Sequence, residues 1–218
     1  MQEGFAMRIA LTFDDGPNTV TTPRVLDVLE EYGIPATLFL ISDNINPESA
    51  SSVRRALSLG CEIENHSVTH SPMAEMPREQ IQAEIAECSR RVTEITGKPP
   101  RFFRPPFISV SPQLFAAVDL TLICGSNCED WNPDISSRER AERTLVNARD
   151  GEIILLHDSL HNEATVEALK IIIPSLRDRG YTFHTVSDLF AACGVSPVPR
   201  RLYSNVFQTA DRPDPERA

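Results

Sequence analysis

The sequence predicts an α/β fold in which parallel strands alternate with helices, arranged as a barrel or as an open, doubly wound sheet. Seven short apolar runs alternate with longer segments of helical periodicity, which is typical of parallel strands joined by right-handed crossovers. Several of the runs are apolar throughout, as expected of strands buried on both faces. Polar residues capable of chemistry follow directly after five of the runs. Both folds collect such residues at the carboxyl ends of their strands, so periodicity alone does not separate them.

The N-terminal half contains three of the predicted strands, separated by helices. Each helix has apolar residues at helical spacing and ends at a glycine, whereas each strand is a short apolar run. In chain order the segments are a strand at 9–11, a helix at 23–32 before Gly33, a strand at 36–41, a helix at 48–59 before Gly60, a strand at 61–65 and a helix at 78–96 before Gly97.

The C-terminal half continues the alternation with four strands. Phe102-Phe103 opens a strand that Pro105-Pro106 interrupts, and Ser111-Pro112 begins a helix with a capping residue followed by proline at the first helical position. The remaining segments are a strand at 120–124, a helix from Ser136 or Ser137 to about 149, a strand at 153–156, a helix at 163–179 before Gly180, a strand at 181–185 and a helix at 187–193.

The alternating pattern stops at about residue 197. We therefore expect one domain at 1–196 and a polar tail at 197–218, packed in part through Leu202, Tyr203 and Phe207. A chain of 218 residues is long enough to bury a substantial core. No apolar run is long enough to span a membrane.

Charge and cysteine content exclude several classes of protein. The net charge of −10 argues against nucleic acid or an anionic membrane as the main partner, because both favour basic patches, and a neutral or basic substrate fits better. The five cysteines include no CxxC pair, which argues against a disulfide framework. The first six residues lack the regions of a signal peptide, so we expect a cytoplasmic protein. A secreted or cell-envelope chain trimmed of its leader would look the same.

Two adjacent carboxylates, Asp14 and Asp15, follow the first strand. Such neighbours raise each other's pKa unless a cation or a strong donor intervenes. A metal resolves the conflict if one Asp binds it and the other stays free as a base. His66 and His70 supply two imidazoles four residues apart, which on one helical turn would face the same way, although histidines at this spacing are usually surface residues. One carboxylate and two imidazoles leave positions open for water and substrate, as in hydrolases.

A hydrolase of this kind also needs a proton donor. His157 ends an apolar strand and is the natural candidate, although a lone histidine there is more often a structural turn residue. His161 repeats the four-residue spacing, but we place it in the following loop and expect it to be incidental.

Two further polar residues have both a structural and a functional interpretation. Arg104 marks either a rigid turn before two prolines or a bidentate, charge-assisted partner that keeps Asp14 ionised. Asp130 and Trp131 are either a helix-approach carboxylate with a core tryptophan or an orienting group for His157 beside an aromatic wall. Each structural interpretation is favoured singly, but together the residues point to an active site.

Five sequence motifs, in the same order, resemble those of the polysaccharide deacetylase family, also called NodB-homology or carbohydrate esterase family 4 domains. The motifs are Thr12-Phe13-Asp14-Asp15-Gly16-Pro17, His66-Ser67-Val68-Thr69-His70, Arg104-Pro105-Pro106-Phe107, Asp130-Trp131 and Leu155-Leu156-His157-Asp158. They span residues 12–158, and the strand–helix rhythm extends the resemblance from about 8 to 193. The resemblance implies a distorted seven-stranded (β/α) barrel and a divalent metal, usually zinc and sometimes cobalt or nickel.

The resemblance also implies roles for the residues of the first, second and last motifs. Asp14 looks like the general base, and Asp15, His66 and His70 look like the metal ligands. His157 looks like the general acid that protonates the leaving group.

The third and fourth motifs, and the leucine before the acid, imply supporting roles. Arg104 is similar to the residue that positions the base, and Asp130 to the one that tunes the acid. The backbone N–H of Phe107 matches the oxyanion contact, and Trp131 and Leu156 would line the pocket for the acetyl methyl group.

The function implied is metal-dependent deacetylation of N-acetylated sugars, such as chitin oligomers or peptidoglycan N-acetylglucosamine, with release of acetate. Hydrolysis of O-acetyl esters on xylan would use the same residues. A non-catalytic sugar-binding module fits less well because all the catalytic positions are filled, and a phosphatase would leave the histidine pair unexplained. Two sites depart from the family pattern: Asn127 stands where an Asp is usual, and Phe107-Ile108 stands where Tyr-Gly is frequent.

Overall fold

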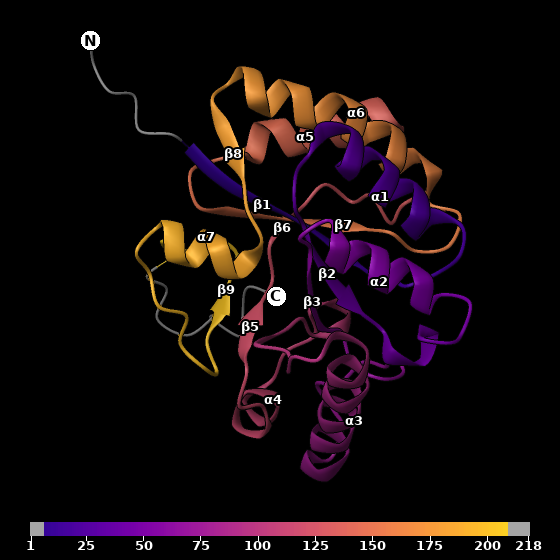
Figure 1. The fold of residues 1–218 in the computed structure, drawn as a ribbon. Coiled ribbons are helices and arrows are strands. Elements are labelled where there is room, and N and C mark those ends of the chain that lie inside the picture. Colours follow the sequence, from indigo (N-terminus) through magenta and orange to yellow (C-terminus); the bar gives the residue numbers. More distant parts are fainter. Residues whose placement is uncertain (1–6, 209–218) are drawn as a thin grey trace.

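The computed structural model describes residues 7–208 (Figure 1). Its strands are β1 (Met7–Asp14), β2 (Thr37–Leu40), β3 (Glu62–Asn65), β4 (Phe102–Phe103), β5 (Thr121–Ile123), β6 (Ser126–Asn127), β7 (Glu152–His157), β8 (Tyr181–Phe183) and β9 (Leu202–Tyr203). Its helices are α1 (Thr21–Tyr32), α2 (Ala50–Ser58), α3 (Arg78–Thr96), α4 (Pro112–Ala117), α5 (Ser137–Asn147), α6 (Glu163–Asp178) and α7 (Val186–Ala192), with short 3₁₀ turns η1 (Ser42–Asn44) and η2 (Pro106–Ile108).

The strands form one curled, parallel sheet in the order β6-β7-β1-β2-β3-β4-β5-β9, and β8 pairs with β1. The predicted parallel α/β fold is confirmed as a curled half-barrel in a single domain. All seven predicted strands are present, and β6 and β9 are additional strands of two residues each. Strand β8 pairs with Met7–Ile9 of β1, whereas β2 pairs with residues 12–14, so one edge of β1 serves two strands in succession.

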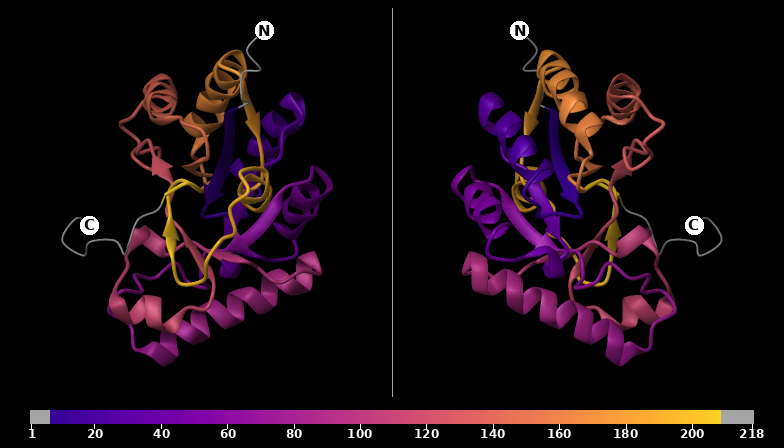
Figure 2. Two further views of the ribbon diagram at one scale, coloured as in Figure 1. Left: turned by 90° about the vertical axis from the view of Figure 1, so that its left-hand side faces the viewer. Right: turned by 90° about the vertical axis from the view of Figure 1, so that its right-hand side faces the viewer.

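Helices α1 to α6 form an outer layer around the sheet, whereas α7 packs on its inner side. Neighbouring helices contact one another from α5 and α6 through α1 and α2 to α3 and α4, and Figure 2 shows α6 at the top of the molecule and the long helix α3 at the bottom. Two helix starts match the predicted caps, because Ser111 and Ser136 accept hydrogen bonds from the backbone N–H groups of Leu114 and Glu139. In the described part of the chain no helix is long and apolar enough to cross a bilayer.

Strand alternation divides the core into two sides. Outward-facing residues such as Leu11 and Phe13 pack under the helices, whereas an inner cluster is closed by α7 and by the segment after it. The segment expected as a tail supplies β9 beside β5, and its Tyr203 is 2% exposed against Phe190. Phe207, by contrast, is 44% exposed. The inner cluster therefore depends on residues far apart in the sequence.

Because the sheet is parallel, the carboxyl ends of its strands lie along one edge. Asp14 and His157 are direct partners across β1 and β7, and Phe39 on β2 is the partner of Asp14 on the other side. His66 follows β3 and Arg104 follows β4. The fold thus gathers the predicted site residues at one edge.

Candidate active site

The two carboxylates at the end of β1 point into one cluster with the histidines. Asp15 has a φ of 76°, and this turn is held by a hydrogen bond from Asn44 to the carbonyl of Asp15. One oxygen of Asp15 (Oδ1) lies 3.3 Å from Nε2 of His70 and 3.6 Å from Nε2 of His66. Asp14 is buried beside it, with its Oδ2 3.6 Å from Nε2 of His66.

The two histidines converge without forming a helical turn, so that part of the prediction is wrong. Ser67 and His70 have φ values of 68° and 60°, and the loop is held by hydrogen bonds from the N–H of Ser67 to the Asn65 side chain and from the N–H of His70 to the Ser67 hydroxyl. The ring centroids of His66 and His70 are 4.9 Å apart. His66 Nδ1 lies 2.7 Å from the carbonyl of Arg104, which requires a proton on Nδ1 and leaves Nε2 as a ligand atom.

These residues fit a divalent metal ion. Asp15, His66 and His70 each offer one ligand atom, and the three atoms lie within 4.8 Å of one another. Asp15 Oδ1 is buried without a hydrogen-bond donor among the described residues. Burial raises the pKa of Asp15, but the neighbouring imidazoles outweigh it and hold the pKa below its usual range. Burial and the neighbouring His66 lower the pKa of His70. An ionised carboxylate with neutral imidazoles is the protonation state that a metal needs.

Arg104 pairs with Asp14 on the inner side of the curled sheet. Its Nη1 donates to Asp14 Oδ1 at 2.6 Å, and both side chains are buried. The contact is a single hydrogen bond rather than the predicted bidentate pair, because Asp14 Oδ2 faces His66 instead. Arg104 therefore compensates the charge of Asp14, while the other carboxylate oxygen stays turned toward His66.

His157 is bound by Asp130. The Oδ1 of Asp130 lies 2.7 Å from His157 Nδ1, and its Oδ2 accepts hydrogen bonds from the backbone N–H of His157 and from the Thr165 hydroxyl, both at 2.7 Å. Burial opposes protonation of His157, but the hydrogen bond and charge of Asp130 outweigh it and raise the pKa of His157 to about 9. His157 is thus protonated at neutral pH, as a proton donor must be.

We expect Asp130→Asn to lower the pKa of His157 by at least about one unit, because the hydrogen bond to an anion is lost. The raised pKa means that protonated His157 stabilises the fold fully below pH 6.5 and that this stabilisation is lost as the pH rises through about 9. An NMR titration of the His157 ring measures the change directly. Asp134→Asn, on the exposed part of the same loop, is the matched control, and an equal shift in both variants would contradict the assignment.

The chain is similar to proteins of one known family. The family model described as polysaccharide deacetylase matches residues 4–121, more than half of the chain. The chain belongs to the polysaccharide deacetylase family. It is 46% identical over 199 residues to the bifunctional xylanase/deacetylase of Pseudobutyrivibrio xylanivorans, covering 91% of this chain but only 33% of that protein. The chain therefore spans about a third of that relative's length.

Two further proteins match over nearly their full length. A peptidoglycan-N-acetylglucosamine deacetylase of Bacillus cereus is 34% identical over 189 residues, which cover 83% of this chain and 87% of that protein. The structure of a family 4 acetyl xylan esterase from Clostridium thermocellum, in complex with a cobalt ion, superposes with a TM-score of 0.90 at 43% identity and covers 92% of this chain and 100% of that one.

One residue that the resemblance assigns to the acetyl pocket of this polysaccharide deacetylase does not reach the site. Leu156 is fully buried in the outer core with Phe13, its partner on β1, so it does not line an acetyl pocket. Successive strand residues face opposite sides, which places Leu155 on the same side as His157. The period of two in the strand was the sequence feature that could have identified Leu155.

The two aromatic residues assigned to the substrate pocket of the deacetylase lie at the surface. Phe107 is 66% exposed, and its ring centroid is 4.6 Å from that of His70. Trp131 is 61% exposed, which excludes the interpretation of a core tryptophan. Phe107 and Ile108 have φ values of 58° and 50°. This conformation is strained for the β-branched Ile108, whereas a glycine, frequent in the family at that position, would adopt it without strain.

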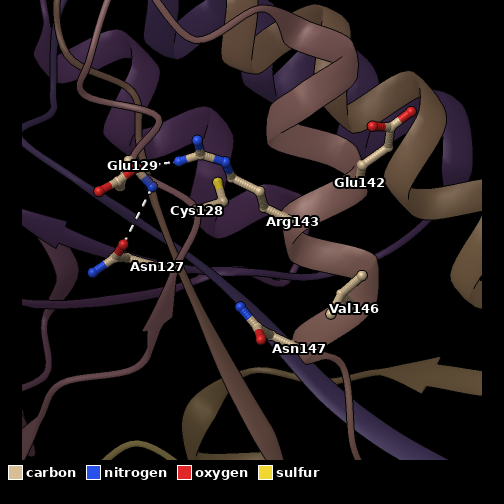
Figure 3. A pocket seen from close by; sticks show the side chains of 7 residues that line it. All are labelled: Asn127, Cys128, Glu129, Glu142, Arg143, Val146 and Asn147. Atoms are coloured by element: carbon tan, nitrogen blue, oxygen red, sulfur yellow. Dashed lines mark hydrogen bonds and ion pairs between the residues drawn. The ribbon is translucent and has the colours of Figure 1, made fainter.

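The other departure from the deacetylase pattern, Asn127, lies in a shallow hollow between α5 and the residues around β6 (Figure 3). The hollow has a volume of about 390 Å³, and none of the predicted catalytic, metal-binding or substrate-binding residues lines it. The Asn127 side chain accepts a hydrogen bond from the N–H of Glu129, and Glu129 pairs with Arg143. The side chain of Asn127 therefore bonds to its own surface loop, while Asp130 supplies the carboxylate that contacts the ring of His157.

Proposed function

We propose that this polysaccharide deacetylase is a metal-dependent hydrolase that removes acetyl groups from N-acetylated sugars and releases acetate. The observation that carries the proposal is the meeting of three groups: the Asp15, His66 and His70 cluster, the Asp14–Arg104 pair and the His157–Asp130 pair. Zinc is the proposed metal, with cobalt or nickel as alternatives, and Asp15, His66 and His70 would hold it. When bound, the ion would polarise the acetyl carbonyl and lower the pKa of a water molecule.

In the proposed reaction, Asp14 would act as the base. Its Oδ1 accepts a hydrogen bond from Arg104, and its Oδ2 lies 3.6 Å from Nε2 of His66, one of the proposed metal ligands. This second oxygen is free of the guanidinium and would take a proton from the attacking water. The new C–O bond forms at the acetyl carbon as this proton moves to Asp14.

His157 completes the reaction as the acid. It is the strand partner of Asp14, so acid and base approach the reacting carbon from adjacent strands. Protonated His157 donates to the amide nitrogen as the C–N bond breaks, because an unprotonated amine is a poor leaving group. The backbone N–H of Phe107 is proposed to stabilise the oxyanion. Acetate and a free amino sugar result, and His157 and Asp14 exchange their protons with solvent.

Removal of O-acetyl groups from xylan is the second candidate function. It is favoured by two of the relatives, a xylanase/deacetylase at 46% identity and an acetyl xylan esterase at 43% identity. The same base and acid serve an ester, for which the C–O bond breaks in place of the C–N bond.

The test is acetate release from chelator-treated protein, with and without added zinc or cobalt, on N-acetylglucosamine oligomers and on acetylated xylan in parallel. We expect metal to restore a rate that chelation abolishes.

His66→Ala should lower the metal content of the folded protein. His184→Ala is the control and should leave the metal content unchanged, because His184 contacts the Thr182 side chain of β8 and none of the proposed ligands. Acetate release that survives full removal of metal would refute the metal dependence, and release from neither substrate would refute the proposed function.

A further inference from the structure

The guanidinium of Arg104 makes fewer hydrogen bonds than a fully buried arginine usually does. The side chain is 0% exposed, and its Nη1 donates to Asp14. Its Nε and Nη2 have no hydrogen-bond partner among the described residues. Arginine carries five N–H donors, and a buried guanidinium usually satisfies most of them. A single hydrogen bond fixes one nitrogen but leaves the plane of the group free to rotate, so other contacts must set its orientation.

Phe39 supplies such a contact. The Cζ of Arg104 lies 4.2 Å from the centroid of the Phe39 ring, within the range of a cation–π interaction. Phe39 is also the register partner of Asp14 across β1 and β2. The pairing of β1 with β2 therefore places Phe39 next to Asp14, and the guanidinium of Arg104 lies on the Phe39 ring.

Gly125 confines the guanidinium further. A Cβ atom at Gly125 would lie 3.2 Å from Nη2 of Arg104 and 3.0 Å from the carbonyl oxygen of Ile153. The backbone at Gly125, with a φ of 89°, thus approaches the guanidinium as closely as its missing side chain allows. Arg104 is enclosed by an aromatic ring, a glycine backbone and one carboxylate.

From these contacts we infer that Phe39 is a positioning residue for the reaction, which acts on Asp14 through Arg104. Its ring fixes the plane of the guanidinium, and the guanidinium in turn fixes the carboxylate that takes the proton from water. This inference rests on the proposed function only for its effect on rate, because the stacking itself is testable without substrate.

Phe102 is a matched control for Phe39. Both rings are fully buried in the inner cluster, but Phe102 stacks on Phe190, with ring centroids 5.8 Å apart. Phe39→Leu and Phe102→Leu remove the same ring and leave similar apolar volume. Both variants should lower the temperature of thermal unfolding, and only Phe39→Leu should disturb Arg104.

We expect Phe39→Leu to lower kcat by roughly tenfold, with little change in KM, because a desolvated cation–π contact is lost. Phe102→Leu should change kcat less than about twofold, and Phe39→Tyr should restore most of the rate because it keeps the aromatic face. In an Arg104→Gln background, Phe39→Leu should add less than about a twofold loss, since the two residues act as one unit.

NMR gives a readout that does not depend on activity. In protein labelled with ¹⁵N-arginine, the Nε–H resonance of Arg104, identified by its loss in Arg104→Gln, should move downfield in Phe39→Leu and stay in place in Phe102→Leu. An unmoved resonance in Phe39→Leu, or equal losses of kcat in the two leucine variants, would overturn the inference. A wild-type protein inactive on every acetylated substrate would refute the proposed function, and the NMR result would still decide the role of Phe39.

Discussion

Asp14→Asn should lower the rate of acetate release by about a thousandfold, the size of a general-base contribution, while the protein keeps its metal. Asparagine preserves the shape of the side chain but cannot accept the proton of the attacking water. The proposed metal ligands Asp15, His66 and His70 are unchanged, so metal content and affinity should stay close to the wild-type values.

Loss of the carboxylate also leaves the buried guanidinium of Arg104 without its anion, which typically costs roughly 3 to 5 kcal/mol of stability. The rate must therefore be measured well below the unfolding temperature of the variant, with metal binding as the measure of folding. Arg104→Gln combined with Asp14→Asn removes the unpaired charge and should recover stability but not rate. If Asp14→Asn retains a wild-type rate, a different group takes the proton.

His157→Ala should have the second large effect, and it should depend on the leaving group. We expect a loss of about a thousandfold on N-acetylated sugars and of about tenfold on an activated aryl acetate, because an activated leaving group departs without protonation. His161→Ala, the exposed histidine four residues further on, is the control and should leave both rates unchanged. The measurement is the ratio of the two kcat/KM values. Similar losses on both substrates would argue that His157 acts in some way other than as the acid.

Local patterns predicted the elements of the fold well. Helix α3 begins and ends at the predicted residues, because its apolar stripe is long and Gly97, with a φ of 73°, ends it. The seven predicted strands are long or apolar enough to be seen in isolation. Strand β9 is not, since its two residues become a strand only by pairing with β5, about 80 positions earlier in the chain.

The site was predictable where chemistry determines the residue type and less so where geometry determines the contact. Carboxylate and imidazole side chains suited to a metal ion can be recognised from their types and spacing. The path of the chain from His66 to His70 could not be predicted, because Ser67 and His70 have positive φ values although neither is a glycine. Phe39 looked like one residue of a buried strand, since its contact with Arg104 joins segments 65 positions apart in the chain.

The placement of residues 202–208 has a practical meaning for protein engineering. These residues follow the last helix, yet β9 covers the open edge of β5, and Val206 and Phe207 pack so closely over Gly151 that a Cβ there would lie 2.7 Å from the Phe207 ring. A catalytic module transplanted into another polypeptide should therefore carry the chain through residue 208. A fusion joint placed just after α7 would leave the β5 edge unpaired and Phe190 uncovered, which invites edge-to-edge aggregation of the hybrid protein.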